Sequence, residues 1–296
     1  MANLRDIKRR IVSIQSTQKI TSAMKMVAAA KLRRAQDATE RARPYAQRMR
    51  ETLEEVAAGS PDAEHPLLET REDKGANRVL MVIPVTSDRG LAGAFNNQIC
   101  KATEALIAER VKRYADIRIM CIGKKAGDFF RRRRPKQLDY VHEVGGNVTY
   151  LDAQSVAKRI IERFEDEQID EVVFVHNEFI STMTQTPRIV QLLPFASSVL
   201  DGEPAEEEED KIEHEIEPSP EALLSTLVPR AVEVEVFRAM LENQAGEHAA
   251  RMTAMESATK NTEELIEKLT LEYNRARQAA ITSELVEIVT GAQALE

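Results

Sequence analysis

Aromatic side chains are scarce in this sequence. It contains no tryptophan, and aromatic residues make up only 4% of the chain, whereas charged residues make up 30%. This composition suits extended, solvated helices better than a single large compact core. The net charge of −8 also argues against bulk binding to nucleic acid.

Cysteine is rare as well. The only two cysteines, Cys100 and Cys121, are too few for a disulfide framework and are typical of a reducing compartment. We interpret both as small buried hydrophobic residues. No stretch approaches the roughly 20 apolar residues that a membrane span needs, and the N-terminal stretch lacks the apolar core of a signal peptide. We therefore expect a protein that is soluble or is held at a membrane by other chains.

The common catalytic and cofactor motifs are missing. The sequence contains neither GxGxxG, nor GxxxxGK[ST], nor GxSxG, and its five histidines lack the spacing of zinc ligands. The turn at residues 87–93 lies between a predicted strand and a predicted helix, where helix N–H groups could hold a phosphate. We favour a tight turn in which Ser87 or Asp88 caps the following helix. We predict no catalytic residue, no cofactor and no metal site.

Glycine and proline are almost absent from the two ends of the chain. Residues 232–289 contain no proline, and their only glycine is Gly246. Residues 4–56 contain no glycine, and their only proline is Pro44. In both segments apolar residues recur three and four positions apart, which is typical of amphipathic helices. The first segment has an excess of Lys and Arg, and the second an excess of Asp and Glu. Opposite charge favours pairing of the two helices.

We therefore predict a long antiparallel coiled coil of residues 1–57 and residues 221–296. The apolar stripe of its first helix includes Ile14, Ile20, Met24, Val27 and Leu32. The second helix is longer, so its last turns should extend beyond the first. Those turns, residues 279–295, contain no charged residue except Glu284 and Glu287. Such an apolar helix end indicates that a partner encloses it.

The middle of the chain reads as an α/β domain, which we place at residues 77–200. Short apolar, β-branched segments alternate there with helical patterns, which is typical of βαβ units in a Rossmann-like, mainly parallel sheet. The predicted strands are residues 78–85, 117–122, 140–144, 171–175 and 188–193. The predicted helices are residues 91–114, 123–134 and 152–167, the last capped by Asp152. Residues 201–220 are acidic and proline-rich, and we interpret them as a solvated loop.

Four segments resemble the gamma subunit of the F-type ATP synthase. They are TQKITSAMKMVAAAKLRRAQ (17–36), SDRGLAGAFN (87–96), EHAARMTAMESATKNTEELI (247–266) and LEYNRARQAAITSELVEIVTGAQAL (271–295). They occur in the order of the family and span nearly the whole chain. The resemblance implies a non-catalytic rotor shaft of the F1 sector, or central stalk, that couples proton-driven rotation to ATP synthesis and hydrolysis.

The resemblance also implies partners and a location. The coiled coil would enter a ring of alpha and beta subunits, and the α/β domain, with the epsilon subunit, would rest on the membrane c ring. The complex would lie on the cytoplasmic face of the bacterial inner membrane. This chain would not itself span the membrane, and it would bind no nucleic acid. By position in the family motifs, Met24 and Lys25 would face the beta subunits. The C-terminal coupling residues would be Arg251, Gln278, Thr282, Glu284 and Glu287.

Two other functions remain open from the residues alone. The chain could be an α/β enzyme with a coiled-coil oligomerisation arm and a site at residues 87–93. It could also be a coiled-coil nucleic-acid binder that uses the basic cluster at residues 131–134, although no aromatic residues are interleaved with these arginines. Ligand calorimetry on the isolated chain would separate the enzyme from the shaft.

Overall fold

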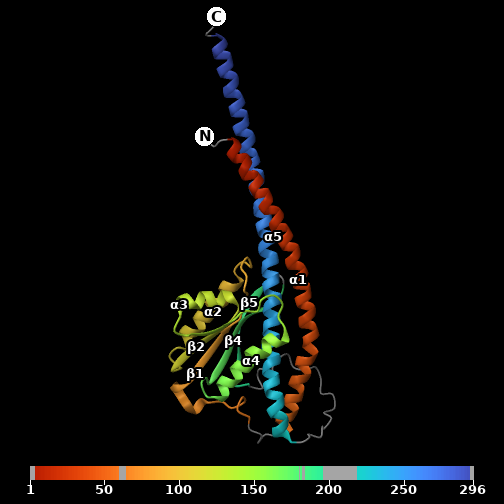
Figure 1. Cartoon of the computed structure of the whole chain (residues 1–296), viewed down its shortest axis with the longest axis vertical. Coiled ribbons are helices and arrows are strands. Elements are labelled where there is room, and N and C mark those ends of the chain that lie inside the picture. The colour runs from red at the N-terminus through yellow and green to blue at the C-terminus, as the bar shows by residue number, and fades with distance from the viewer. Residues whose placement is uncertain (1–3, 60–64, 180, 182–183, 196–218, 294–296) are drawn as a thin grey trace. The chain divides into compact units, whose positions relative to one another are not determined.

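The computed structural model describes residues 4–59, 65–179, 181, 184–195 and 219–293 (Figure 1). The chain divides into two compact units. The helical unit consists of residues 1–29 and 251–296, and the α/β unit of residues 30–250. Helices α1 (Leu4–Gly59) and α5 (Pro220–Gln293) contribute to both. The predicted acidic loop, apart from its last two residues, lies outside the described residues.

The α/β unit is built on a five-stranded sheet with the order β3-β2-β1-β4-β5. Its strands are β1 (Val79–Pro84), β2 (Asp116–Ile122), β3 (Leu138–His142), β4 (Glu171–Phe179) and β5 (Gln185–Leu193). The first four are parallel, which confirms the predicted mainly parallel sheet. β5 runs antiparallel to β4. Only residues 180–184 connect these two strands, whereas a parallel crossover needs a dozen residues or more.

Helices cover both faces of the sheet. A short 3-10 helix, η1 (Glu72–Asn77), precedes β1. Helices α2 (Phe95–Arg110) and α3 (Lys124–Arg133) pack on the face where Leu80 and Val82 of β1 are buried. Met81 and Ile83 point to the opposite face, as the period of two in a strand requires. α4 (Tyr150–Glu165) covers that face together with parts of α1 and α5.

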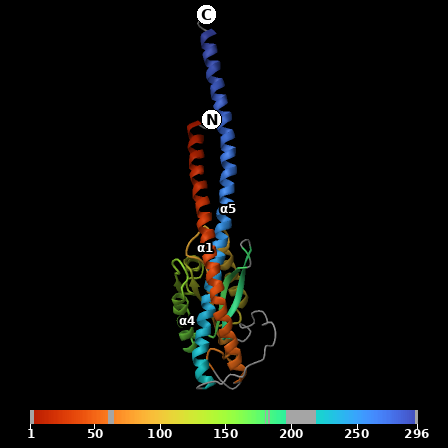
Figure 2. The ribbon, with the colours of Figure 1, turned by 90° about the vertical axis from the view of Figure 1, so that its right-hand side faces the viewer.

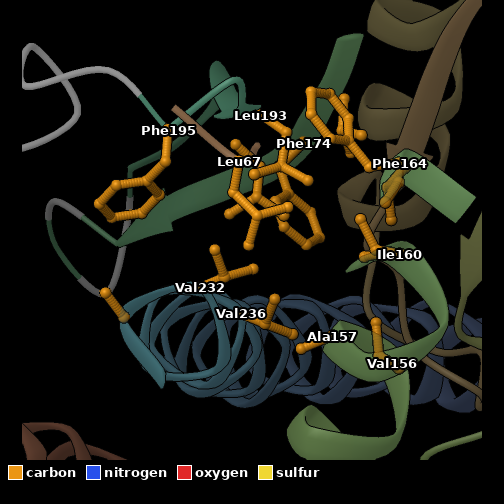
Figure 3. Close-up of a cluster of buried hydrophobic side chains, with 14 of the residues drawn as sticks. Leu67, Val156, Ala157, Ile160, Phe164, Phe174, Leu193, Phe195, Val232 and Val236 are labelled. Atoms are coloured by element: carbon orange, nitrogen blue, oxygen red, sulfur yellow. The ribbon is translucent and has the colours of Figure 1, made fainter. Parts of the chain in front are cut away.

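The core on the α4 face joins segments that are far apart in the sequence. Val232 and Val236 of α5 point toward Phe174 of β4 and Leu67 (Figure 3). Both valines and Leu67 have no exposed surface. Met49, Leu53 and Val56 of α1 are buried in the same cluster. The sheet therefore packs against one segment of each long helix.

The N-terminus of α4 corrects one prediction. Thr149, not Asp152, caps the helix, and its hydroxyl accepts a hydrogen bond from the Asp152 N–H. The Asp152 carboxylate in turn accepts the Thr149 N–H at 2.9 Å. This is a capping box, in which the acidic residue lies three positions inside the helix. An Asp in the first turn of a helix thus need not be its N-cap.

In the helical unit, α1 and α5 lie side by side and antiparallel (Figure 2). The Thr259 and Thr21 hydroxyls are 2.8 Å apart, and Lys25 Nζ is 2.6 Å from a Glu256 oxygen. The residue number rises along α1 as it falls along α5, which defines the antiparallel direction. Within this unit α5 continues past the N-terminus of α1 (Figure 1). The predicted pairing of the two long helices is confirmed.

The seam between the two helices differs from the predicted stripe. Thr21 and Ala28 are buried, whereas Ile20 and Val27 are 56% and 57% exposed. The buried pair is seven residues apart, as in a heptad seam that holds small side chains. The prediction that Ile20 and Val27 belong to the seam was wrong, because it weighted hydrophobicity above the heptad register.

Gly123 joins β2 to α3 and has a φ of +95°. A Cβ at this position would lie 2.3 Å from the backbone oxygen of Thr86. Both the left-handed backbone and the lack of space therefore require glycine.

Gly123→Ala should lower the free energy of unfolding by roughly 2–4 kcal/mol, since it combines backbone strain with a backbone clash. Thermal and urea denaturation of the full chain would measure the change. Gly146→Ala is the matched control, because a Cβ there meets nothing within 4 Å. Equal stability of the two variants would contradict this explanation.

Candidate partner-binding surface

In open α/β sheets, ligands bind outside the carboxyl ends of the strands, at the point where the strand order reverses. Here the order reverses between β1 and β4. The turn at residues 87–93 follows β1, so the predicted alternative enzyme site would lie at this edge. Its geometry decides whether the α/β unit can hold a ligand there.

Asp88 occupies the anion position at this edge. Its carboxylate accepts hydrogen bonds of 2.7 Å from the backbone N–H groups of Lys124 and Gly145. Lys124 is the first residue of α3, where a phosphate would otherwise bind. Because the chain fills this position with its own carboxylate, the N-terminus of α3 does not attract a second anion.

The prediction that Ser87 or Asp88 caps the following helix was wrong. The first residue before α2 is Ala94, and no side chain caps that helix. The Ser87 N–H donates to Asn96 Oδ1 at 2.9 Å, and its hydroxyl donates to the Arg89 carbonyl at 2.7 Å. The turn is closed by these local bonds, while Asp88 caps α3, which follows the next strand.

α5 covers the carboxyl edge of the sheet. Glu242 lies 3.5 Å from His176, near the end of β4. The Gln244 side chain donates to the Gly146 carbonyl at 3.0 Å. A Cβ on Gly246 would lie 3.1 Å from the Phe95 ring, at the start of α2. α5 therefore fills the place where a Rossmann-like fold would bind its ligand.

Two of the four arginines in the basic cluster at residues 131–134 form ion pairs with neighbouring carboxylates. Arg131 lies 3.2 Å from an Asp128 oxygen. Arg133 lies 2.9 Å from Glu104 and stacks over the Phe129 ring at 4.6 Å. These surface ion pairs give no support to the nucleic-acid alternative.

The predicted partner-binding residues fall into two groups, both in the helical unit. Met24, Lys25 and Arg251 are partly buried. Gln278, Thr282, Glu284 and Glu287 are exposed on the last turns of α5. The second group begins 22 residues after Glu256, the partner of Lys25, or about 33 Å along a helix at 1.5 Å per residue. The structure does not bring the two groups together.

Exposed apolar side chains surround the second group. Five of them in the last turns of α5 are 49% to 63% exposed: Ile281, Leu285, Val286, Ile288 and Val289. On α1, Val12, Ile20, Met26 and Val27 are 56% to 65% exposed. We call these nine residues the apolar surface. Exposed apolar residues that gather on a helix mark a protein interaction site.

Sequence reasoning assigned Ile20 and Val27, in the α1 part of the apolar surface, to the helix seam. The run of small and apolar residues after Met24 was the available signal, because one seam cannot hold consecutive positions of a helix.

Comparison with known proteins identifies the family. A family model described as ATP synthase matches residues 3–295. The ATP synthase gamma chain of Anaeromyxobacter sp. (strain Fw109-5) is 48% identical over 299 residues, and that of Trichlorobacter lovleyi is 46% identical. Both alignments cover 100% of each chain. The chain belongs to the ATP synthase gamma-chain family.

Solved structures show the same fold. A chain of the Euglena gracilis mitochondrial ATP synthase has a TM-score of 0.66 at 18% identity, with 99% of this chain and 94% of that chain covered. A chain from the central stalk and c-ring of the Tetrahymena thermophila mitochondrial ATP synthase has a TM-score of 0.60 at 25% identity, with coverage of 81% and 99%. The resemblance to gamma subunits is confirmed.

A gamma chain is a non-catalytic subunit of the ATP synthase. Across the described ranges, no helix is long and apolar enough to cross a membrane. In the same part of the chain, no group of three His, Cys, Asp or Glu side chains could hold a metal ion.

The isolated gamma chain should give no saturable heat when titrated with MgATP, because Asp88 and α5 fill the carboxyl edge of the sheet. Isothermal calorimetry on the purified chain measures this directly. Asp88→Asn, which removes the charge at the N-terminus of α3, serves as the comparison. Stoichiometric binding of MgATP by the unmodified chain would contradict this expectation and support the enzyme alternative.

Proposed function

We propose that this gamma chain is the rotating central shaft of a proton-translocating ATP synthase. The apolar surface carries the proposal, because exposed apolar helix turns need an enclosing partner in water. The alpha and beta subunits would enclose the last turns of α5, and the epsilon subunit and c ring would bind the α/β unit. Rotation of the c ring would turn the shaft, which then stabilises successive conformations of the beta subunits.

The proposed location is the cytoplasmic face of the bacterial inner membrane. The ATP synthase gamma chain is part of the F1 sector. The two relatives named above are the gamma chains of Anaeromyxobacter and Trichlorobacter. Attachment would occur through the c ring and not through a segment of this chain.

Met24, Lys25, Arg251, Gln278, Thr282, Glu284 and Glu287 are the proposed partner-binding residues. The exposed position of the last four supports this role. Lys25 is bound to Glu256 inside the helical unit, so its ammonium group would be shared between that carboxylate and the beta subunits.

A crosslink between the shaft and the ring should stop turnover. Val286→Cys places a thiol on an exposed position, and a cleavable thiol–amine reagent would join it to the alpha/beta ring. The native cysteines should not compete, because both are buried and burial raises the pKa of each thiol, to about 12 for Cys100. ATP hydrolysis should fall with the crosslinked fraction and return after cleavage. Full turnover in the crosslinked complex would refute the shaft.

Lys25→Gln should alter coupling without unfolding the chain. The Lys25 and Glu256 side chains are 40% and 59% exposed, and a pair this exposed contributes less than about 1 kcal/mol. We expect an unchanged melting temperature and a lower ratio of ATP synthesis to ATP hydrolysis in membrane vesicles. Lys19→Gln, on the exposed surface of the same helix, is the control. An unchanged ratio would remove Lys25 from the proposed set.

A further inference from the structure

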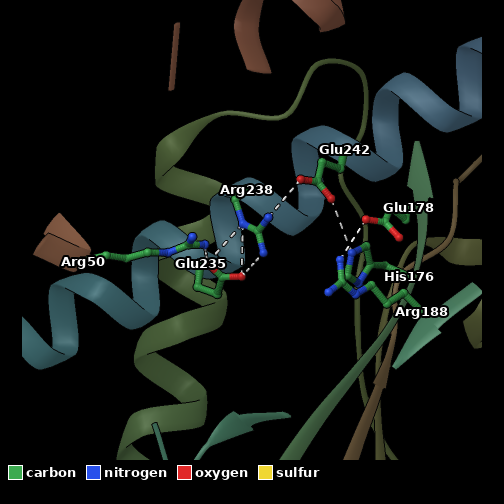
Figure 4. A network of polar contacts seen from close by, with 7 residues as sticks. All are labelled: Arg50, His176, Glu178, Arg188, Glu235, Arg238 and Glu242. Atoms are coloured by element: carbon green, nitrogen blue, oxygen red, sulfur yellow. Dashed lines mark hydrogen bonds and ion pairs between the residues drawn. The ribbon is translucent and has the colours of Figure 1, made fainter. Parts of the chain in front are cut away.

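A continuous line of polar contacts crosses the α/β unit from α1 through α5 to β4 (Figure 4). Arg50 of α1 lies 3.5 Å from Glu235 of α5. Glu235 forms an ion pair with Arg238, and Arg238 lies 3.2 Å from Glu242. Glu242 lies 3.5 Å from His176 of β4. We call these five residues the polar joint.

The polar joint is set into an apolar contact. Glu235 is 6% and His176 is 2% exposed. Val236 and Met240, which lie between Glu235 and Glu242 in the sequence of α5, belong to the apolar core. Buried ion pairs are often no more stable than well-packed apolar side chains of similar volume. The stability of the α/β unit therefore does not account for charges at this position.

Two charges of the polar joint, those of Arg238 and Glu242, are stabilised by their neighbours. Burial alone would raise the pKa of Glu242, but its bond to His176 and the charge of Arg238 outweigh burial and lower that pKa. Burial would likewise lower the pKa of Arg238, but Glu235 and Glu242 raise it. The Arg238 and Glu242 side chains thus stay ionised, and their hydrogen bonds stay charge-assisted.

Directional contacts restrict a helix in a way that apolar contacts do not. Apolar cores tolerate repacking when the total volume is kept. A hydrogen bond loses its energy when the angle changes, and networks strengthen each bond. Turning α5 about its axis would break its bonds to Arg50 on one side and to His176 on the other. The polar joint therefore selects one rotational position of α5.

We propose that the polar joint transmits torque between the α/β unit and α5. The proposal rests on the shaft function given above and names the residues that carry the load. Arg50, Glu235, Arg238, Glu242 and His176 act as positioning residues. They hold α5 at a fixed angle while the c ring turns the α/β unit against the resistance of the catalytic ring.

An apolar replacement separates torque from stability. In the variant Arg50→Met/His176→Leu/Glu235→Leu/Arg238→Met/Glu242→Leu, all five members of the polar joint are replaced, so no buried partner is left unpaired. The chain should assemble, and its melting temperature should not fall. ATP hydrolysis by the F1 sector without its c ring should stay within about twofold, because no external load acts. Proton-driven ATP synthesis in vesicles should fall by about tenfold, within the range for coupled residues. Normal synthesis by this stable variant would overturn the proposal.

A single substitution provides a second test if the apolar variant does not fold. Glu242→Gln keeps the side-chain volume and removes the charge that links Arg238 to His176. The matched control is Glu104→Gln. The Glu104 carboxylate pairs with Arg133, and the Glu104 side chain is 25% exposed, compared with 20% for the Glu242 side chain. The synthesis-to-hydrolysis ratio should fall for Glu242→Gln alone, and Glu242→Asp should recover part of it. Equal ratios in both Gln variants would contradict the torque role.

Failure of this proposal differs from failure of the shaft function. If the chain is not the shaft, the unmodified protein will not assemble with the alpha and beta subunits, and no crosslink from Val286→Cys will stop hydrolysis. If only the polar joint is misassigned, assembly and crosslink inhibition will hold while the apolar variant synthesises ATP at the normal rate.

Discussion

The packing of α5 against the α4 face of the sheet is the contact on which the α/β unit depends. Val232 and Val236 are fully buried against the strand layer, and burial of each such side chain stabilises a fold by roughly 1.5–3 kcal/mol. α1 places Leu53 and Val56 in the same cluster. Segments of both long helices thereby complete the core on this face of the sheet.

A later part of α5 occupies the edge at which Rossmann-like sheets usually bind their ligands. α5 crosses the carboxyl ends of the strands, and Asp88 fills the N-terminus of α3. A fold does not determine function, because function resides in the groups placed at the site. Here those groups bond to one another. The edge that binds substrates in enzymes holds a helix in this gamma chain.

The α/β unit buries an apolar core, whereas the helical unit leaves some of its apolar side chains exposed. Leu285 and Ile288 are more than half exposed, which a partner must compensate. A non-catalytic subunit that has a closed α/β core and exposed apolar helix turns can act on other subunits only through contact. Its effect on catalysis must therefore arise from preferential binding to one partner conformation over another.

The sequence by itself determined the elements. Helical periodicity, the lack of glycine and proline, and the buried β-branched runs predicted both long helices and a mainly parallel sheet, and the four motifs pointed to the gamma family. These signals are local. Tertiary structure alone decided that Asp88 caps α3, and that Thr21 and Ala28 form the helix seam. It also decided that Glu242 meets His176, since contacts between residues so distant in the chain depend on how the elements pack, which no local pattern records.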